Sequence, residues 1–291
     1  MRHFWLAALV VLVVGLVAGP VGAAEPSEES KQELARALTL HASFDASLAA
    51  DFSVAEKTSF DLRGAEALPA KPTDDVVLVP EGGRFGGALR FKRKNPFSPA
   101  FKDGGVLNYN DKNWSTTVSV WLRLDPDKDL EPGYCDPVQI VGDEMKKGFI
   151  FLEWSKDETP RYFRYAIRPL FEIWNPTNVA WDKIPFAKRP MVQIERAPFS
   201  RDEWTHVVFT IENANDKTQT QRGRLYINGQ PQGQIENWEL TLGWKPERVM
   251  LVLGASYVGD MDDLAVFNRA LKDEEVKTLY GLTAGVRELK K

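Results

Sequence analysis

Short segments in which apolar and polar residues alternate restrict the fold of this chain more than any other feature of its sequence. Segment 117–124 places four aliphatic residues on one face and Ser119, Trp121 and Arg123 on the other, because successive side chains of a strand point in opposite directions. Segment 204–212 repeats the pattern, with Val207, Phe209 and Ile211 on one face. Both segments are therefore expected to be strands with one buried face.

A hairpin is expected at Asn228-Gly229, which separates two extended runs. A type I′ turn needs positive φ at both central residues, and Asn-Gly meets that need best. Other short apolar runs bounded by turn residues predict further strands at 76–79, 88–91, 138–141, 148–154, 161–167, 248–254 and 263–267. Many short strands with such turns indicate an all-β fold, a two-sheet antiparallel jelly-roll sandwich.

One helix is expected, in segment 271–282 near the C-terminus. Its first turn is acidic, Leu271, Val276 and Leu279 share a face, and Gly281 ends it. The chain shows no internal repeat and no linker. We therefore expect one domain over residues 38–283, preceded by a polar lead-in at 25–37 and followed by a C-terminal tail at 284–291.

The N-terminus has the pattern of a secretory signal peptide, residues 1–24. A basic start precedes an apolar stretch from Phe4 to Ala18, and small residues up to Ala24 suit a signal peptidase. The apolar stretch is short for a membrane span, so a retained anchor is the alternative. The pattern predicts a secreted, periplasmic or cell-surface protein.

Charge and residue counts exclude several classes of function. The chain has 291 residues and a formal charge of −4, so it has no excess of basic residues for nucleic acid. A single cysteine, Cys135, rules out an intramolecular disulfide, and we expect it to be a buried bystander. Only His41 and His206 follow the signal, which argues against a histidine-based zinc site.

In their order along the chain, these segments resemble the laminin-G-like jelly roll of the concanavalin A-like lectin/glucanase superfamily. The matching segments are 38-LTLHASFD-45, 84-RFGGALRF-91, 116-TTVSVWLRL-124, 204-WTHVVFTIE-212, 224-RLYINGQ-230 and 259-GDMDDLAVFNRALKDEEVKTLY-280. The resemblance implies two curved antiparallel sheets and, in most relatives, a binding function for carbohydrates or proteins. Some relatives are glucanases, so the fold alone does not decide the function.

The catalytic motif of the glucanases in this superfamily is absent. The resemblance implies Glu-x-Asp-x-Glu on one strand, because the two catalytic carboxyl groups must lie about 5–5.5 Å apart. The nearest candidates are Asp143-Glu144, which point to opposite faces, and Glu153, which precedes a turn with Asp157 and Glu158. Neither arrangement gives paired carboxylates on one face, which favours a non-catalytic protein.

Aromatic residues in segment 171–199 are the best candidates for a sugar site. Trp174, Trp181 and Phe186 lie among Asn, Asp, Lys and Arg residues, and sugar C–H faces stack on rings while the hydroxyl groups need polar partners. The alternative is that these rings fold back and cap the sandwich. Trp121 and Arg123 are further candidates on the outward face of their strand, and for Trp121 a packing role is the alternative.

Two other groups of residues have open roles. The basic run Arg90, Lys92, Arg93 and Lys94 either meets an anionic polysaccharide or is a solvated strand end. Trp238 and Trp244 either line a binding site or fill the core.

The resemblance also implies one structural calcium ion in many relatives. Its ligands come from the aspartate before the last strand and from an acidic residue near the first strand, which here are Asp262 and Asp45. Calcium takes six to eight oxygen ligands, so backbone carbonyls near Gly87 and water would complete the site. The alternative is that Asp262 accepts hydrogen bonds from backbone N–H groups in a turn.

The sequence thus predicts an exported, monomeric, non-catalytic module that recognises a glycan or a cell-envelope or extracellular protein partner. The alternatives are a divergent glycoside hydrolase or polysaccharide lyase on the same fold, and a purely structural surface protein.

Overall fold

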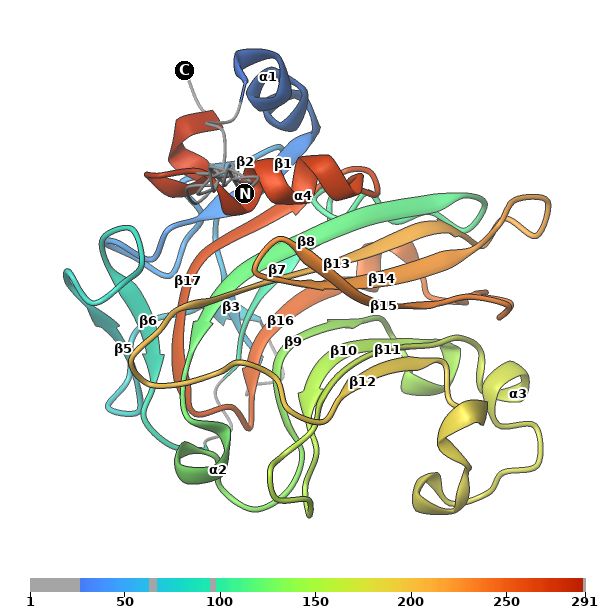
Figure 1. Ribbon diagram of the computed structural model, residues 1–291. Coiled ribbons are helices and arrows are strands. Elements are labelled where there is room, and N and C mark those ends of the chain that lie inside the picture. Colours follow the sequence, from blue (N-terminus) through green and yellow to red (C-terminus); the bar gives the residue numbers. More distant parts are fainter. Residues whose placement is uncertain (1–26, 63–66, 95–97, 290–291) are drawn as a thin grey trace, which may run out of the picture.

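Two antiparallel sheets packed face to face form the body of the protein (Figure 1). The computed structural model describes residues 27–62, 67–94 and 98–289, so the expected signal peptide at 1–24 lies outside the described residues. The first sheet has the order β15 (Gln230–Ile235), β14 (Arg222–Ile227), β13 (Thr205–Ala214), β8 (Trp114–Arg123), β17 (Gly259–Phe267), β1 (Leu38–Ala42) and β2 (Phe52–Ser53). At one end of β17, β6 (Ala88–Phe91) also pairs with it and in turn pairs with β5 (Val76–Val79).

The second sheet has eight strands among the described residues. Its order is β12 (Met191–Ile194), β11 (Phe163–Arg168), β10 (Phe149–Trp154), β9 (Cys135–Val141), β16 (Met250–Ala255), β7 (Pro99–Lys102), β3 (Phe60–Asp61) and β4 (Leu68–Pro69). The jelly-roll sandwich predicted from the sequence is confirmed, and every strand expected from alternation coincides with a strand of one of the two sheets.

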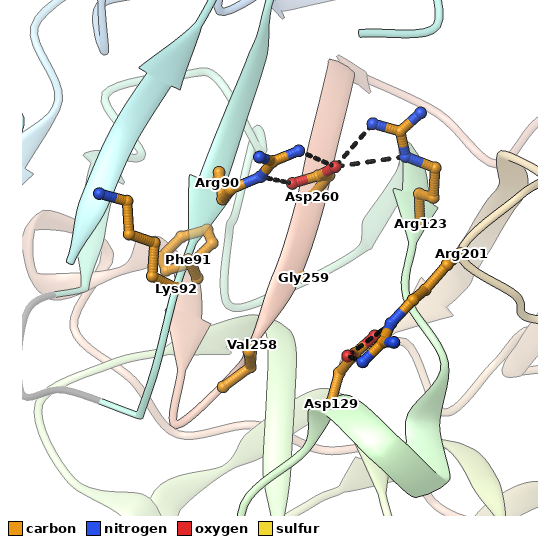
Figure 2. A pocket seen from close by; sticks show the side chains of 9 residues that line it. All are labelled: Arg90, Phe91, Lys92, Arg123, Asp129, Arg201, Val258, Gly259 and Asp260. Atoms are coloured by element: carbon orange, nitrogen blue, oxygen red, sulfur yellow. Dashed lines mark hydrogen bonds and ion pairs between the residues drawn. The ribbon is translucent and has the colours of Figure 1, made fainter. Parts of the chain in front are cut away.

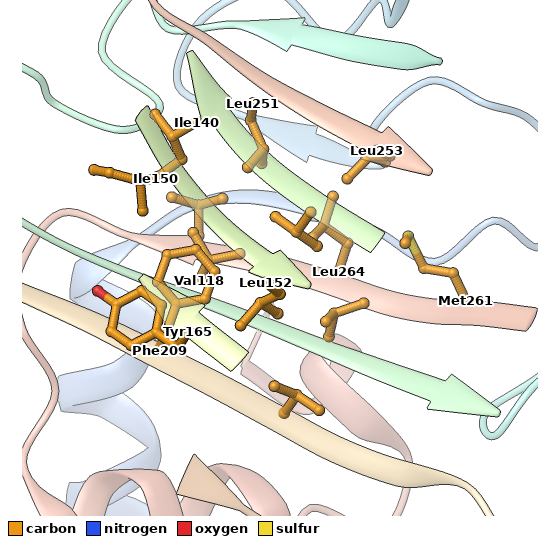
Figure 3. Close-up of a cluster of buried hydrophobic side chains, with 14 of the residues drawn as sticks. Val118, Ile140, Ile150, Leu152, Tyr165, Phe209, Leu251, Leu253, Met261 and Leu264 are labelled. Atoms are coloured by element: carbon orange, nitrogen blue, oxygen red, sulfur yellow. The ribbon is translucent and has the colours of Figure 1, made fainter. Parts of the chain in front are cut away.

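The core lies between the sheets and contains the apolar face of each alternating strand. Figure 3 shows Val118 and Phe209 of the first sheet meeting Ile150, Leu152 and Tyr165 of the second. All five side chains are buried, at most 1% exposed. Since each buried aliphatic or aromatic side chain contributes roughly 1.5–3 kcal/mol, this contact is the main source of stability for the fold.

Helices cover the outer face of the first sheet (Figure 1). The expected C-terminal helix is present as α4 (Asp273–Tyr280), and it packs against α1 (Glu28–Ala37) and the 3₁₀ helix η5 (Gly285–Leu289). Ser27 caps α1 by accepting a hydrogen bond from the Ser30 N–H. Residues 28–37 of the expected polar lead-in form a helix in which Leu34 and Ala37 are buried, and residues 285–289 of the expected C-terminal tail form a 3₁₀ helix in which Gly285, Val286 and Leu289 are buried.

The hairpin at Asn228-Gly229 has the predicted geometry. Both residues have positive φ, 50° for Asn228 and 73° for Gly229, and they join β14 to β15. The Asn228 side-chain oxygen also accepts a hydrogen bond from the His206 N–H at 2.9 Å, which ties the turn to β13.

The remaining helical segments are short and lie in connections. They are α2 (Pro126–Asp129), η1 (Met145–Lys147), α3 (Phe171–Trp174), η2 (Trp181–Lys183), η3 (Phe186–Lys188) and η4 (Pro246–Arg248). Three of them, α3, η2 and η3, form the excursion between β11 and β12 at one end of the second sheet (Figure 1). Within the described ranges, no helix is long and apolar enough to cross a membrane.

Candidate functional site

The outer face of the second sheet carries a row of polar side chains, in contrast to the helix-covered face of the first sheet. Alternation buries Phe163, Tyr165 and Ile167 in the core and turns Arg164 and Arg168 outward. Strand pairing then places Arg164 opposite Glu153 of β10 on one side and Gln193 of β12 on the other. Polar residues from three strands thus form one row.

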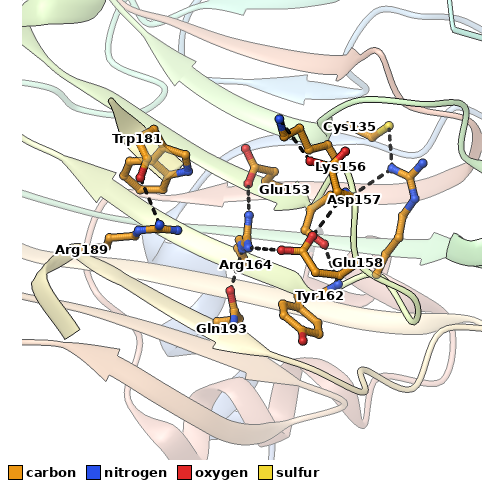
Figure 4. A network of polar contacts seen from close by, with 12 residues as sticks. Cys135, Glu153, Lys156, Asp157, Glu158, Tyr162, Arg164, Trp181, Arg189 and Gln193 are labelled. Atoms are coloured by element: carbon orange, nitrogen blue, oxygen red, sulfur yellow. Dashed lines mark hydrogen bonds and ion pairs between the residues drawn. The ribbon is translucent and has the colours of Figure 1, made fainter. Parts of the chain in front are cut away.

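Arg164 is the centre of this polar row (Figure 4). Its guanidinium donates to Glu153 Oε1 at 3.1 Å, to Glu158 Oε1 at 3.3 Å and to Gln193 Oε1 at 2.8 Å. Glu153 and Arg164 are both at most 5% exposed. A buried ion pair is retained only where hydrogen bonds satisfy its charges, and Arg164 meets that condition with all three partners.

Asp136 of β9 is a second buried carboxyl group on this face. Burial, and secondarily the charge of Glu153, raise the pKa of Asp136 to about 8. Its Oδ2 accepts a hydrogen bond from Gln139 at 2.7 Å, and its Oδ1 has no partner among the described residues. Burial also raises the pKa of Glu153, while Arg164 acts in the opposite direction. At neutral pH Asp136 is therefore protonated in the folded protein.

Aromatic rings surround the second outward arginine of β11, Arg168. Its guanidinium carbon lies 3.8 Å from the ring centroid of Trp181, 5.1 Å from that of Trp174 and 4.8 Å from that of Phe151. These distances are those of cation–π contacts. Burial lowers the pKa of Arg168 to about 10, so it remains charged at neutral pH, and its Nε has no partner among the described residues.

Local hydrogen bonds give the excursion between β11 and β12 a defined shape. The buried Asn175 side chain donates to the Val179 carbonyl and accepts from the Val179 N–H, both at 2.9 Å, which closes a five-residue loop. Arg189 donates to the carbonyls of Ile184 and Trp181 at 2.9 and 3.0 Å. These bonds fix the position of Trp181 relative to the sheet.

Two cavities flank this excursion and share the side chains of Trp174, Asn175 and Val179. One, of about 320 Å³, is lined by Arg168, Trp174 and Trp181 together with rings from Phe149 and Phe171, and we call it the aromatic cleft. The other, of about 510 Å³, lies against Trp238. Both volumes fall within the roughly 300–1,000 Å³ of ligand sites.

The structure places the predicted aromatic residues differently from one another. Trp174 and Trp181 are half-buried and line the aromatic cleft, in edge-to-face contact with ring centroids 5.6 Å apart. Phe186 is 47% exposed and is not among the side chains that line either cavity. Trp244 is buried and fills the core, so of the two open tryptophans Trp238 is the one beside a cavity.

Trp121 and Arg123 are not brought together with the aromatic cleft. Trp121 is 4% exposed and stacks on His206 and on Tyr280 of α4, so it packs the helix against the first sheet. His206 is a hydrogen-bonded structural histidine: its Nε2 lies 2.8 Å from Ser119 Oγ, and burial lowers its pKa to about 3. Arg123 instead donates to Asp260 at 2.8 Å, at the other end of the strand pair.

The two residues expected to bind calcium do lie against the same loop, residues 83–87. Asp262 Oδ2 accepts from the Phe85 N–H at 2.9 Å, and Asp45 Oδ1 accepts from the Gly87 N–H at 2.6 Å. A Cβ atom on Gly83 would lie 2.7 Å from Asp262 Oδ2 and 1.9 Å from the Gly87 carbonyl oxygen. Only glycine at position 83 therefore permits this approach.

The chemistry of these groups fits a calcium ion. Asp262 is 1% exposed, burial raises its pKa to about 7, and its Oδ1 has no partner among the described residues. An oxygen donor set with a partnerless buried carboxylate oxygen is what calcium prefers. The described part of the chain has no group of three or more Asp, Glu, His or Cys side chains placed to hold a metal ion, so carbonyls and water would supply the other ligands. Arg287 donates to Asp45 Oδ2 at 3.0 Å and to the Phe85 carbonyl, and so competes for the same acceptors.

Sequence reasoning missed Asp136, Arg164 and Arg168. The search for catalytic carboxylates followed single strands, whereas Asp136 and Glu153 come from neighbouring strands and meet only through pairing. For the arginines a signal was available, because 163-FRYAIR-168 alternates two arginines with three large apolar residues. Two outward cations on one strand of a sandwich indicate a polar outer face.

Comparison with known proteins agrees with the fold. The family model Laminin_G_3, described as the concanavalin A-like lectin/glucanases superfamily, matches residues 102–277, which is more than half of the chain. No curated protein sequence matches the chain.

Among solved structures, the binding domain of botulinum neurotoxin serotype D is similar, with a TM-score of 0.51 and 13% identity. The match covers 85% of this chain and 52% of that domain, so the chain spans about half of its length, and it shows a shared fold. Domain 4 of AbnA, a GH43 extracellular arabinanase from Geobacillus stearothermophilus, in complex with arabinotriose, gives a TM-score of 0.48 and 18% identity over 83% of this chain and 97% of that one.

Proposed function

The chain belongs to the Laminin_G_3 family of the concanavalin A-like lectin/glucanases superfamily, and from this premise we propose that it is an exported, non-catalytic module that binds a glycan in the aromatic cleft. The superfamily description joins lectins, which bind carbohydrates, and glucanases, which cleave them. The proposal concerns the described domain and assigns its ligand to a place on the outer face of the second sheet.

One observation carries the proposal: Arg168 is held between Trp174 and Trp181 at the wall of an open cavity of about 320 Å³. The partly exposed indole rings of Trp174 and Trp181 offer apolar surface for sugar C–H groups. The guanidinium and the exposed amide of Asn178 offer donors for sugar oxygens. Because Asn175 and Arg189 already fix the loop, little conformational entropy is lost when a ligand binds.

The test is glycan binding by purified protein, first on a glycan array and then by calorimetry with the oligosaccharides it selects. We expect Trp174→Ala and Trp181→Ala each to weaken binding by at least about tenfold, because rigid aromatic anchors carry much of the energy of such sites. Phe186→Ala is the matched control, since Phe186 belongs to the same loop but not to the lining of the cleft, and it should bind like the wild type. Unchanged affinity in both tryptophan variants would refute the assignment of the site.

A glycoside hydrolase is a second candidate, favoured by the buried pair Asp136 and Glu153. A protonated acid beside an ionisable carboxyl group is the arrangement that hydrolysis of glycosidic bonds requires. Against it, the two groups are 7% and 5% exposed, and neither lines a described cavity wall. Release of reducing sugar from a bound oligosaccharide, abolished by Glu153→Gln, would replace the binding proposal with this one.

We also propose that Asp45 and Asp262 hold one structural calcium ion together with carbonyl groups of the 83–87 loop. The ion would supply the positive charge that the buried Asp262 carboxylate lacks. We expect added calcium to raise the melting temperature of chelator-treated protein and Asp262→Asn to remove the response. A wild-type melting temperature that is identical with calcium and with chelator would rule out the site.

A further inference from the structure

A separate cavity of about 380 Å³ lies beside the first sheet, where five segments of the chain meet (Figure 2). Its walls come from the end of β6, the end of β8, the start of β17, the end of α2 that carries Asp129 and the loop that holds Arg201. The aromatic cleft lies on the outer face of the other sheet and shares no lining residue with it. We call this second cavity the arginine pocket.

The lining of the arginine pocket is strongly unbalanced in charge. Four cationic side chains and two carboxylates line it, namely Arg90, Lys92, Arg123, Arg201, Asp129 and Asp260. Two positive charges are therefore in excess, on a chain whose overall formal charge is −4. A local excess that opposes the net charge of the molecule attracts anions to this one place.

Asp260 holds two of the guanidinium groups in position. It is 6% exposed and accepts from Arg90 Nε and Nη2 at 2.6 and 2.9 Å, and from Arg123 Nη2 at 2.8 Å. Arg123 is also fixed by the Gly82 carbonyl at 2.9 Å and by the ring of Trp204, 4.6 Å from its guanidinium carbon. One carboxylate between two fixed guanidinium groups leaves one positive charge uncompensated at a rigid site.

Donors remain available on the cationic groups that face the cavity. Within the part of the chain that the structure describes, Arg90 Nη1 and Lys92 Nζ have no protein acceptor, and the Arg201 side chain is 59% exposed although it pairs with Asp129. Guanidinium groups match carboxylates through paired, planar hydrogen bonds. Beneath them, Val258 and Gly259 give the pocket an apolar floor that suits the C–H face of a sugar ring.

From these features we propose that the arginine pocket is a binding site for an acidic saccharide, with the carboxylate of a uronic acid residue set between Arg90, Arg123 and Arg201. This site assigns a function to the basic run at residues 90–94, of which Arg90 and Lys92 line the pocket. It is independent of the aromatic cleft, so either site stands if the other fails.

The experiment measures binding of trigalacturonate by calorimetry at low and moderate ionic strength, with its fully methyl-esterified form as the uncharged probe. We expect the acid to bind, the ester to bind at least about tenfold more weakly, and added salt to weaken only the acid. Arg201→Gln and Lys92→Gln should each reduce affinity for the acid several-fold. Arg196→Gln, an exposed arginine away from the pocket, is the matched control.

Asp129→Asn gives a test with the opposite sign. It removes a carboxylate that competes for Arg201 and leaves an oxygen to accept the Asp125 N–H, a bond of 2.7 Å in the structure. We expect this variant to bind trigalacturonate more tightly than the wild type, whereas a merely structural role for Asp129 would weaken binding.

Equal binding of acid and ester, or no effect of Arg201→Gln and Lys92→Gln, would overturn the proposal. Trp174→Ala should leave trigalacturonate binding unchanged, which separates this site from the aromatic cleft.

Discussion

Replacing Asp136 by asparagine should change how the stability of the protein depends on pH. The pKa of Asp136 is about 8 in the folded protein and 3.8 in an ordinary aspartate, because burial and the charge of Glu153 disfavour its ionised form. The folded state therefore binds one more proton than the unfolded state between these two values. The contribution of Asp136 to the free energy of unfolding is therefore fully present below pH 3.8 and is lost as the pH rises through about 8.

The size of the effect follows from the same values. Within this window one extra bound proton lowers the free energy of unfolding by about 1.4 kcal/mol for each pH unit, or about 3 kcal/mol between pH 5 and pH 7. Asparagine does not titrate, and it keeps an oxygen for the hydrogen bond from Gln139. Asp136→Asn should therefore lack this loss and become progressively more stable than the wild type as the pH rises.

The assay is urea unfolding of both proteins at several pH values from 5 to 8, and the quantity of interest is the difference between their free energies of unfolding. Taking the difference removes the other titrating groups, such as His206 and Asp262, which both proteins share. Asp111→Asn, at an exposed position, serves as the control and should follow the wild type. Parallel curves for the wild type and Asp136→Asn would refute the inference that Asp136 is buried as a neutral acid.

Three further outcomes follow from the contacts described above. Arg164→Met should lower the free energy of unfolding by about 3–5 kcal/mol, because it leaves Glu153 buried without its partner. Glu153→Gln should lower the free energy of unfolding by less, and equal effects of the two variants in urea unfolding would contradict this reasoning. Trp121→Ala should cost about 3–5 kcal/mol, since its ring packs α4 on the sheet, yet leave glycan affinity unchanged in calorimetry. Arg287→Gln should enlarge the rise in melting temperature that calcium causes, because the guanidinium no longer competes for Asp45. A rise smaller than that of the wild type would mean that Arg287 supports the site.

The strands were predictable because their two faces differ so strongly in polarity. Val118 and Val120 had to face the other sheet, and a shift of one residue would have turned them away from that core and turned Arg123 into it. The hairpin followed from Asn228-Gly229 alone, since few other pairs adopt two positive φ values. The packed helix α1 could not be found in this way, because among its ten residues only Leu34 and Ala37 are buried, too few for a clear helical period.

The candidate sites were harder to predict than the strands. Trp174 and Trp181 stood out by composition, but their partner Arg168 comes from a different element and joins them only in space. Asp136 and Glu153 are separated by 16 intervening residues and by the register of two strands, which local patterns do not specify. Phe186 and Trp181 looked equivalent in sequence, and only the course of the loop distinguishes the exposed ring from the one packed on Arg168.

The contact between α1 and η5 also determines how the protein can be attached to a surface. Lys31 of α1 and Glu288 of η5 form an ion pair at 3.0 Å, so the first and last described segments lie together over the outer face of the first sheet. The aromatic cleft belongs to the outer face of the other sheet. A sensor chip or a fluorescent fusion coupled near Ser27 would therefore leave the cleft directed toward the solution, and an array of such molecules would present their aromatic clefts in one common orientation.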